Sequence, residues 1–221
     1  MTDLSATDIF GAMLVGTYYT IVLSMAAVVG GSLLGLVVML ARLSKRTAIA
    51  RGARLFVEIF QGTPLLIQLF LIYFGLPILG IELPAFVAAA VAMSLFSAAF
   101  LGETWKGSVE SVPAGQWEAG TALALGFRAQ MVFIILPQAI RTAMAPTVGF
   151  LVQIIKGTSL TSIIGFTELS RTGINLTNAT FQPLLMYGVA AAIYFSLCAP
   201  LSTLSRHLER RFSTAQERLL I

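Results

Sequence analysis

The stretch IFGAMLVGTYYTIVLSMAAVVGGSLLGLVVMLA, residues 9–41, contains no charged side chain. A helix needs about 20 apolar residues to cross the hydrocarbon core of a bilayer, so this stretch predicts a transmembrane helix. It is longer than one perpendicular crossing requires, and we expect it to tilt or to project beyond the membrane. The residues before it include Asp3 and Asp8 but no Lys or Arg. A cleavable signal has basic residues there, so the first span is expected to be retained.

The composition of the whole chain agrees with a membrane protein. Of its 221 residues, 57% are hydrophobic and 11% are charged, whereas soluble domains carry about 25% charged residues. The mean hydropathy is +0.88. We expect one transmembrane domain over residues 1–221. The chain has a single cysteine, Cys198, and a single histidine, His207. These counts exclude an intrachain disulfide and argue against a metal site or a histidine-based catalytic triad, so we expect neither metal nor enzymatic chemistry.

Further apolar segments predict an all-α membrane fold of about five transmembrane helices. The fourth is interrupted, because Pro137 and Pro146 break the pattern and Arg141 lies between them. We place that span after Arg141, with Pro137 near the membrane entry. The five predicted spans are residues 9–41, 59–81, 83–102, 142–155 and 183–204.

The basic residues predict the orientation of these spans, because cytoplasmic loops retain Lys and Arg. Twelve of them fall on one side: Arg42, Lys45, Arg46, Arg51, Arg54, Lys106, Arg128, Arg141, Arg206, Arg210, Arg211 and Arg218. Only Lys156 and Arg171 fall on the other. We therefore expect the N-terminus outside, the C-terminus inside, and a cytoplasmic tail at about 205–221. Membrane topology accounts for the net charge of +4, and nucleic acid is not needed as a partner.

The connecting segment 103–138 is long for a cytoplasmic loop and is not very polar. Pro113 suits the start of a short helix, and the small residues that follow suit a helix ending near Gly126. Such a helix would expose Trp117, Leu123 and part of Leu125. Exposed apolar residues on a helix often mark a partner protein. The alternative is that the helix packs on its own bundle, and the residues alone favour neither.

Glu118-Ala119-Gly120, followed by Ile134-Ile135-Leu136-Pro137, resembles the EAA loop of ABC-importer permeases. The wider sequence is similar to the polar amino-acid uptake branch of that family. The resemblance covers nearly the whole chain. The matching stretches are Gly62-Thr63-Pro64-Leu65-Leu66, Ser97-Ala98-Ala99-Phe100, Glu103, Ser111-Val112-Pro113-Ala114-Gly115-Gln116-Trp117-Glu118-Ala119, Ile135-Leu136-Pro137-Gln138-Ala139 and Thr158-Ser159-Leu160.

This resemblance implies that the loop at about 106–137 carries a coupling helix, which docks in a groove of a cytoplasmic ATPase. The residues assigned to this coupling are Trp117, Glu118, Ala119, Gly120, Leu123 and Gly126. Gly120 stands where the family has its third loop alanine, and Ala124 stands where the family has a glycine. These exchanges of small residues should leave docking possible. Gly157 stands where the family often has an acidic residue, so a preference for a charged substrate does not carry over.

Polar side chains inside a bilayer are costly and are therefore candidates for function. The segment 153–171 is rich in hydroxyls and can break a helix, which would suit a zwitterionic ligand. The alternative is a polar external loop. Ser94 and Ser97 share a helix face and would line a pathway or bond to backbone carbonyls of the preceding turn. The predicted substrate-pathway residues are Ser94, Ser97, Phe100, Gln153, Lys156, Thr158, Ser159, Thr161 and Ser162.

Two local motifs carry structural predictions. Pro64 is tolerated in the first turn of a helix, so Gly62-Thr63-Pro64 is interpreted as a plain helix start rather than a break. Gly31 and Gly35 form a small-x3-small pair, which permits close helix contact. We expect this pair to pack inside the chain, with a subunit interface as the alternative.

The sequence thus predicts the permease subunit of an ATP-driven amino-acid importer in the bacterial cytoplasmic (inner) membrane. It has no glycine-rich loop ending in Gly-Lys-Ser/Thr, so ATP and Mg²⁺ are expected on a partner ATPase and no cofactor on this chain. The resemblance also implies a second permease subunit, identical or homologous, and an extracytoplasmic amino-acid-binding protein. The alternative is an ion- or proton-coupled secondary transporter. Such transporters more often show related repeats, and none is evident here.

Overall fold

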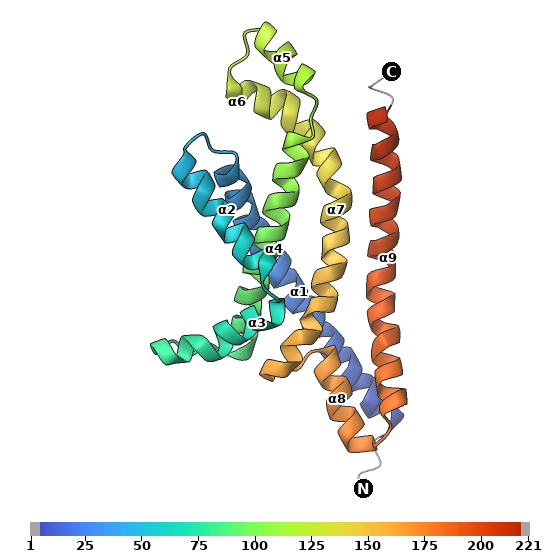
Figure 1. Ribbon diagram of the computed structural model, residues 1–221. Helices are drawn as coiled ribbons and strands as arrows, with labels where there is room; N and C mark the ends of the chain where they lie inside the picture. The colour runs from blue at the N-terminus through green and yellow to red at the C-terminus, as the bar shows by residue number, and fades with distance from the viewer. Residues whose placement is uncertain (1–4, 218–221) are drawn as a thin grey trace.

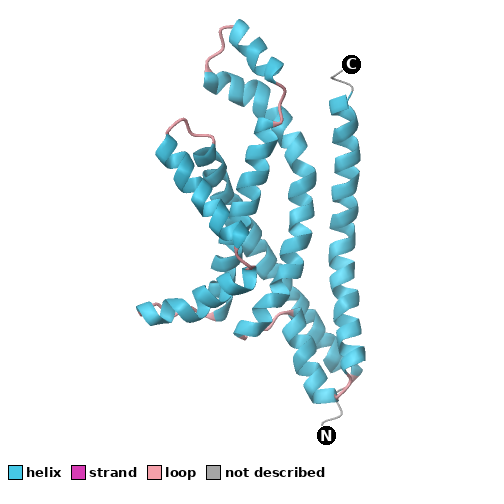
Figure 2. Cartoon of the chain, in the orientation of Figure 1, coloured by secondary structure: helices cyan, strands magenta, loops and turns pink. Residues whose placement is uncertain are grey.

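The computed structural model describes residues 5–217, and side chains as far as residue 212. The described part of the chain is helical and contains no strand (Figure 2). The elements are α1 Ala6–Arg42, α2 Thr47–Gly62, α3 Leu65–Phe70, the π-helix η1 Leu71–Gly75, the 3-10 helix η2 Leu76–Leu79, α4 Ala85–Glu110, α5 Ala114–Ala122, α6 Phe127–Gln130, the π-helix η3 Met131–Ile135, α7 Leu136–Gly157, the 3-10 helix η4 Thr158–Ile164, α8 Leu169–Thr180 and α9 Pro183–Glu217.

The helical runs confirm about five spans. Four described helical runs are long and apolar enough to cross a membrane, and the bent pair that joins α2 to the segment 65–79 makes five. α1 lies obliquely behind the other helices, α4 and α7 rise side by side to α5 and α6, and α9 flanks α7 (Figure 1). The two ends of the described chain lie at opposite ends of the bundle.

The contact between α1 and α4 is the most extensive between described elements. A Cβ atom added to Gly31 would lie 2.2 Å from Ser97 Cβ, and one added to Gly35 would lie 3.3 Å from the carbonyl oxygen of Ala98. Only residues without a side chain permit this approach of two backbones. The Gly31–Gly35 pair therefore packs inside the chain, as expected.

The second span differs from its prediction. α2 begins at Thr47, twelve residues before the predicted boundary, so Arg51 and Arg54 lie on a helix rather than in a loop. It ends at Gly62, and the next helix leaves at an angle of 104°. The interpretation of Gly62-Thr63-Pro64 as a plain helix start was wrong. Pro64 does begin α3, but Thr63 is extended and a separate helix has just ended.

Gln68 stabilises this break. Its side-chain amide donates to the carbonyl oxygens of Phe60 and Thr63, over 2.9 and 3.1 Å, and to the hydroxyl of Thr63 over 3.0 Å. A helix end leaves carbonyl groups without intrahelical partners, and these groups must be satisfied inside a membrane. Sequence reasoning did not single out Gln68, although a polar residue four positions after a proline in an apolar stretch was a signal.

Three other helices extend beyond their predicted spans. α4 continues to Glu110, and α9 continues to Glu217 through the predicted tail; Arg218 lies outside the described residues. α7 runs through Pro146 without ending, so the prediction that this proline breaks the span was wrong. Transmembrane helices tolerate proline inside the helix. Pro146 has no N–H for the carbonyl of Thr142, four residues earlier. The hydroxyl of Ser205 on α9 donates to a different carbonyl, that of Ala145, over 2.8 Å and so ties α9 to this part of α7.

Candidate functional site

The short helix predicted after Pro113 is present as α5, at one end of the molecule, beyond the ends of α4 and α7 (Figure 1). Pro113 precedes its first residue, as expected, but the helix ends at Ala122 rather than near Gly126. Glu118 and Ala119 are exposed, and Leu123 is 72% exposed. α5 thus presents small, acidic and apolar groups outward together.

The inner side of α5 is fixed by the chain itself. Gly120 is buried, and a Cβ atom there would lie 2.9 Å from Gln130 Cγ. Gln130 in turn donates to the carbonyl of Leu125 over 2.8 Å and to the hydroxyl of Thr121 over 3.2 Å. Gly120 therefore faces the chain's own packing rather than a docking surface, and an alanine here would force Gln130 to move.

Trp117 is half-buried, and its ring stacks on that of Phe127 at a centroid distance of 6.0 Å. The loop between α5 and α6 passes through Ala124, whose φ is +55°. That left-handed conformation strains a residue with a Cβ atom. Gly126 precedes α6 with an ordinary φ of −68°, so the glycine of this loop does not occupy the left-handed position.

The predicted substrate segment is a broken helix, as its sequence indicates. α7 passes into the 3-10 helix η4, which ends at Gly165 with φ +86°. Thr158 and Thr161 are buried, and their hydroxyls donate to the carbonyls of Ile155 and Thr158. Ser159 donates likewise to Lys156.

Three other residues complete this segment. Ser162 is buried, and its carbonyl oxygen accepts from Arg171 over 3.5 Å. Gln153 and Lys156 are exposed, and their polar groups have no hydrogen-bond partner among the described residues. They are the groups of this segment that remain available to a ligand.

The two broken regions of the chain meet. A Cβ atom built on Gly157 would lie 3.4 Å from Leu65 Cδ2 and 3.7 Å from Met93 Cε, which are ordinary contacts. The break before α3 thus packs against the end of α7. Because a Cβ atom would fit there, the contacts of position 157 do not require glycine, where the family often has an acid.

Ser94 and Ser97 share a face of α4, as predicted, and that face is turned to α1. Cβ atoms added to Gly30 and Gly31 would touch Ser94 Oγ and Ser97 Cβ respectively. Ser97 is fully buried, and its hydroxyl has no partner among the described residues. Phe100 is half-buried and stacks on Phe150 of α7 at 5.5 Å. Ser94, Ser97 and Phe100 therefore lie in contacts between helices. They are not grouped with Gln153 and Lys156 of the broken segment.

Glu168 was not among the predicted site residues, yet it is fully buried. Its carboxylate accepts from the backbone N–H groups of Ser170 and Arg171, both over 2.8 Å, and from the hydroxyl of Tyr194 over 2.7 Å. The side chain caps α8 and joins it to α9. A single acid just before a helical stretch was the signal for the cap, whereas nothing local indicates Tyr194.

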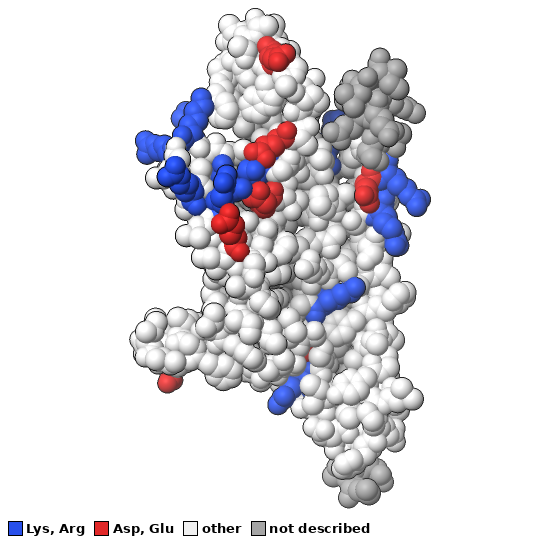
Figure 3. Space-filling view, viewed as in Figure 1, with Lys and Arg blue, Asp and Glu red and all other residues white. Residues whose placement is uncertain are grey.

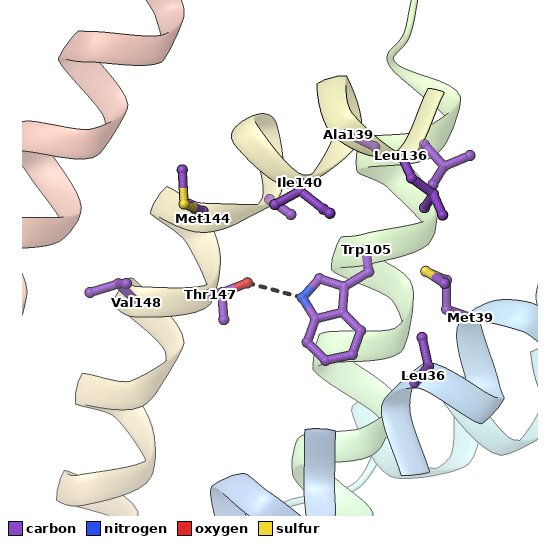
Figure 4. Close-up of a pocket in the computed structure, with 11 residues that line it drawn as sticks. Leu36, Met39, Trp105, Leu136, Ala139, Ile140, Met144, Thr147 and Val148 are labelled. Carbon is purple, nitrogen blue, oxygen red and sulfur yellow. Dashed lines mark hydrogen bonds between the residues drawn. The ribbon is translucent and has the colours of Figure 1, made fainter. Parts of the chain in front are cut away.

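An apolar cavity of about 460 Å³ lies between α1, α4 and α7 (Figure 4). Leu36, Trp105 and Met144 are among the side chains that point into it. The indole N–H of Trp105 donates to the hydroxyl of Thr147 over 3.0 Å, so the two polar side-chain groups in the wall of the cavity are bonded to each other. A zwitterion would find no free hydrogen-bonding side chain here, so this cavity is not the candidate substrate site.

Comparison with known proteins gives consistent matches. The family described as "Binding-protein-dependent transport system inner membrane component" matches residues 27–214. A probable amino-acid ABC transporter permease protein of Bacillus subtilis, YckA, is 35% identical over 94% of this chain and 92% of its own length. The L-cystine transport system permease protein TcyB of the same organism is 37% identical over 89% of this chain and 84% of its own.

A relative in Escherichia coli and a solved structure extend the likeness. The glutamine transport system permease protein GlnP of E. coli is 33% identical over 89% of this chain and 90% of its own length. A chain of a crystallised amino acid ABC transporter with histidines superposes with a TM-score of 0.89 at 32% identity, over 96% of this chain and 99% of that chain. The MetNI methionine ABC transporter, at 16% identity and a TM-score of 0.77, shares the fold. The chain therefore belongs to the family of binding-protein-dependent transport system inner membrane components, as a membrane-spanning ABC-transporter permease.

Proposed function

We propose that this chain carries amino acids inward as the permease subunit of an ATP-driven importer, in the bacterial inner membrane. The amino-acid ABC transporter permeases similar over almost their whole length support this substrate class. The observation that carries the proposal is α5, a helix held from inside by Gln130 that exposes Glu118, Ala119 and Leu123. Exposed apolar groups on a fixed helix suit a docking partner.

The mechanism assigns ATP and Mg²⁺ to a cytoplasmic ATPase that receives α5. Closure of paired ATPases around ATP displaces α5, and the shift passes through α6 and η3 into α7. α7 ends at the broken segment beside Lys156, so access there changes with the state of the ATPases. The energy is the differential affinity of ATP for the two states. A second permease, identical or homologous, completes the pathway, and an extracytoplasmic binding protein delivers the amino acid.

The orientation in this proposal places α5 in the cytoplasm, the N-terminus outside and the C-terminus inside. The Lys and Arg residues gather at the α5 end of the visible face, with few elsewhere on it, which supports this orientation (Figure 3). Gln153 and Lys156 are proposed as the polar groups that first meet a substrate, because they are exposed beside the broken helix.

The test is affinity purification of the tagged chain from its native membrane, with identification of the proteins that accompany it. A stoichiometric ATPase is expected, and Glu118→Arg should release it by placing a cation in the docking groove. Glu82→Arg is the matched control, because Glu82 is equally exposed but lies between η2 and α4. An ATPase that stays bound to Glu118→Arg would refute docking through α5.

A chain that purifies alone would favour the alternative, an ion- or proton-coupled secondary transporter. The sequence matches reported above do not favour it, since they are to ABC permeases. Uptake into liposomes driven by a proton gradient without ATP would establish that alternative. Uptake that needs ATP and the partner ATPase would exclude it.

A further inference from the structure

Four basic side chains gather where α1 ends and α2 begins. Lys45 and Arg46 lie in the turn between the helices, and Arg51 and Arg54 follow in the first eight residues of α2. All four are exposed. Figure 3 shows Lys and Arg side chains gathered over this end of α2.

These four cations lack carboxylate partners within the described part of the chain. The ion pairs found there use Arg42 and Lys106 with Glu103 and Glu110 instead. Glu58 is the single acid of α2, and it forms no ion pair with Arg54 one turn away. The cluster therefore keeps a local excess of positive charge.

The faces of α2 place this charge against lipid rather than open water. Val57 is buried against the bundle, whereas Leu55 and Ile59, one turn apart, are 57% and 51% exposed. Arg51 and Arg54 are three residues apart and share the neighbouring stripe. Because α2 is the first half of a bent span, its exposed apolar stripe meets hydrocarbon, and its basic stripe lies at the end where the span enters the bilayer.

The cluster follows directly on a long uncharged stretch. The apolar run of α1 ends at Ala41, and Lys45 and Arg46 lie within five residues of that end. Arg54 lies about 11 Å further along the axis of α2 than Thr47, and arginine side chains extend from such positions back to the phosphates. The anion that is abundant at this depth is the phosphate of a phospholipid.

We propose that Lys45, Arg46, Arg51 and Arg54 form a binding surface for the headgroups of anionic phospholipids in the leaflet that faces α5. Juxtamembrane clusters of Lys and Arg attract such lipids with a free energy that adds up over the charges. Lys45 also connects this surface to the coupling element, because its ammonium lies 5.6 Å from the centre of the Phe127 ring on which Trp117 stacks. A lipid phosphate bound to Lys45 therefore lies next to α5.

The test uses the purified full chain in neutral detergent, with no ATP, so its outcome is independent of the proposed transport function. Native mass spectrometry counts the phosphatidylglycerol and phosphatidylcholine molecules that the chain retains. The variant carries Lys45→Gln, Arg46→Gln, Arg51→Gln and Arg54→Gln. The control removes four cations from elsewhere on the same side, with Arg128→Gln, Arg141→Gln, Arg206→Gln and Arg211→Gln.

We expect the variant to bind phosphatidylglycerol at least about tenfold more weakly, since each cation near a phosphate contributes to the attraction. The control and the retention of phosphatidylcholine should change little. An equal loss of phosphatidylglycerol from the variant and the control would mean that total charge, not this surface, binds the lipid, and it would overturn the proposal. Unchanged retention of phosphatidylglycerol by the variant would also overturn it. A thermal midpoint measured in phosphatidylcholine, equal for the variant and the native chain, establishes that the variant is folded.

Discussion

The carboxylate of Glu168 accepts a hydrogen bond of 2.7 Å from the phenol of Tyr194, which joins the start of α8 to the middle of α9. Glu168 is fully buried, and its carboxylate also accepts from two backbone N–H groups. A buried group that loses its partner leaves others unsatisfied, which costs about 1–3 kcal/mol.

Glu168→Ala should therefore lower the free energy of unfolding by about 2–3 kcal/mol, because it removes a helix cap and leaves the Tyr194 hydroxyl only its contact with Ser170 Oγ at 3.0 Å. Tyr194→Phe removes the bonds of one hydroxyl to Glu168 and Ser170 but leaves the cap in place, and it should cost about 1–2 kcal/mol. Denaturant unfolding in detergent measures both values. A smaller loss for Glu168→Ala than for Tyr194→Phe would contradict the capping role.

Ala124→Gly should stabilise the segment between α5 and α6 by about 1 kcal/mol, since glycine adopts a positive φ without strain. Ala122→Gly is the matched control, because Ala122 ends α5 in helical conformation and its replacement should destabilise by up to about 1 kcal/mol. Hydrogen exchange of the α5 amides reports both changes. If both variants changed the protection of the α5 amides in the same direction, strain at Ala124 would be contradicted.

Gly31→Ala should lower the thermal midpoint clearly, because its Cβ atom would lie 2.2 Å from Ser97 Cβ and force α1 away from α4. Overpacking of this kind costs about 1–3 kcal/mol. Gly11→Ala lies on the same helix with no atom within 4 Å and should be neutral or slightly stabilising. Ser97→Gly should rescue Gly31→Ala, and a failure of this rescue would place the clash elsewhere.

Glu103→Gln should cost more stability than Glu110→Gln. The carboxylate of Glu103 accepts hydrogen bonds from Nε and Nη2 of Arg42, over 3.0 and 3.1 Å. The side chain of Arg42 is only 10% exposed. Glu110 pairs with Lys106 alone and is 54% exposed. We expect about 1–2 kcal/mol for the first and below 1 kcal/mol for the second, because solvent screens exposed pairs. A double-mutant cycle with Arg42→Gln isolates the coupling energy.

Much of the architecture could be predicted because a bilayer imposes a length and a polarity on each span. Residues 9–41 and 183–204 were predictable as helices from that constraint alone. The break at Thr63 was not, since Pro64 suits a helix start in either case, and only the hydrogen bonds of Gln68 distinguish the two. The passage of α7 through Pro146 was not predictable either, because a proline in an apolar run can end a helix or lie within it, and the local residues do not decide between the two.

In the candidate site, too, some features follow from the local sequence and others depend on residues far away in the chain. The broken segment after Gly157 follows from its local residues, and so does a short helix after Pro113. Spacing put Ser94 and Ser97 on one face but could not tell which neighbour that face meets. The inward position of Gly120 depends on where the chain turns back at Gln130, which no periodicity indicates.

Helical structure continues without a loop from Phe127 through α7 to Ile164, over 38 residues. At a rise of 1.5 Å per residue, about 45 Å of backbone separates Phe127 from Lys156. The run changes from π-helix to α-helix at Leu136 and from α-helix to 3-10 helix at Thr158, and no loop interrupts it. If ATPases move α5 as proposed above, the two ends belong to one hydrogen-bonded element, and one turn added to α7 would set them about 5 Å further apart without altering either end.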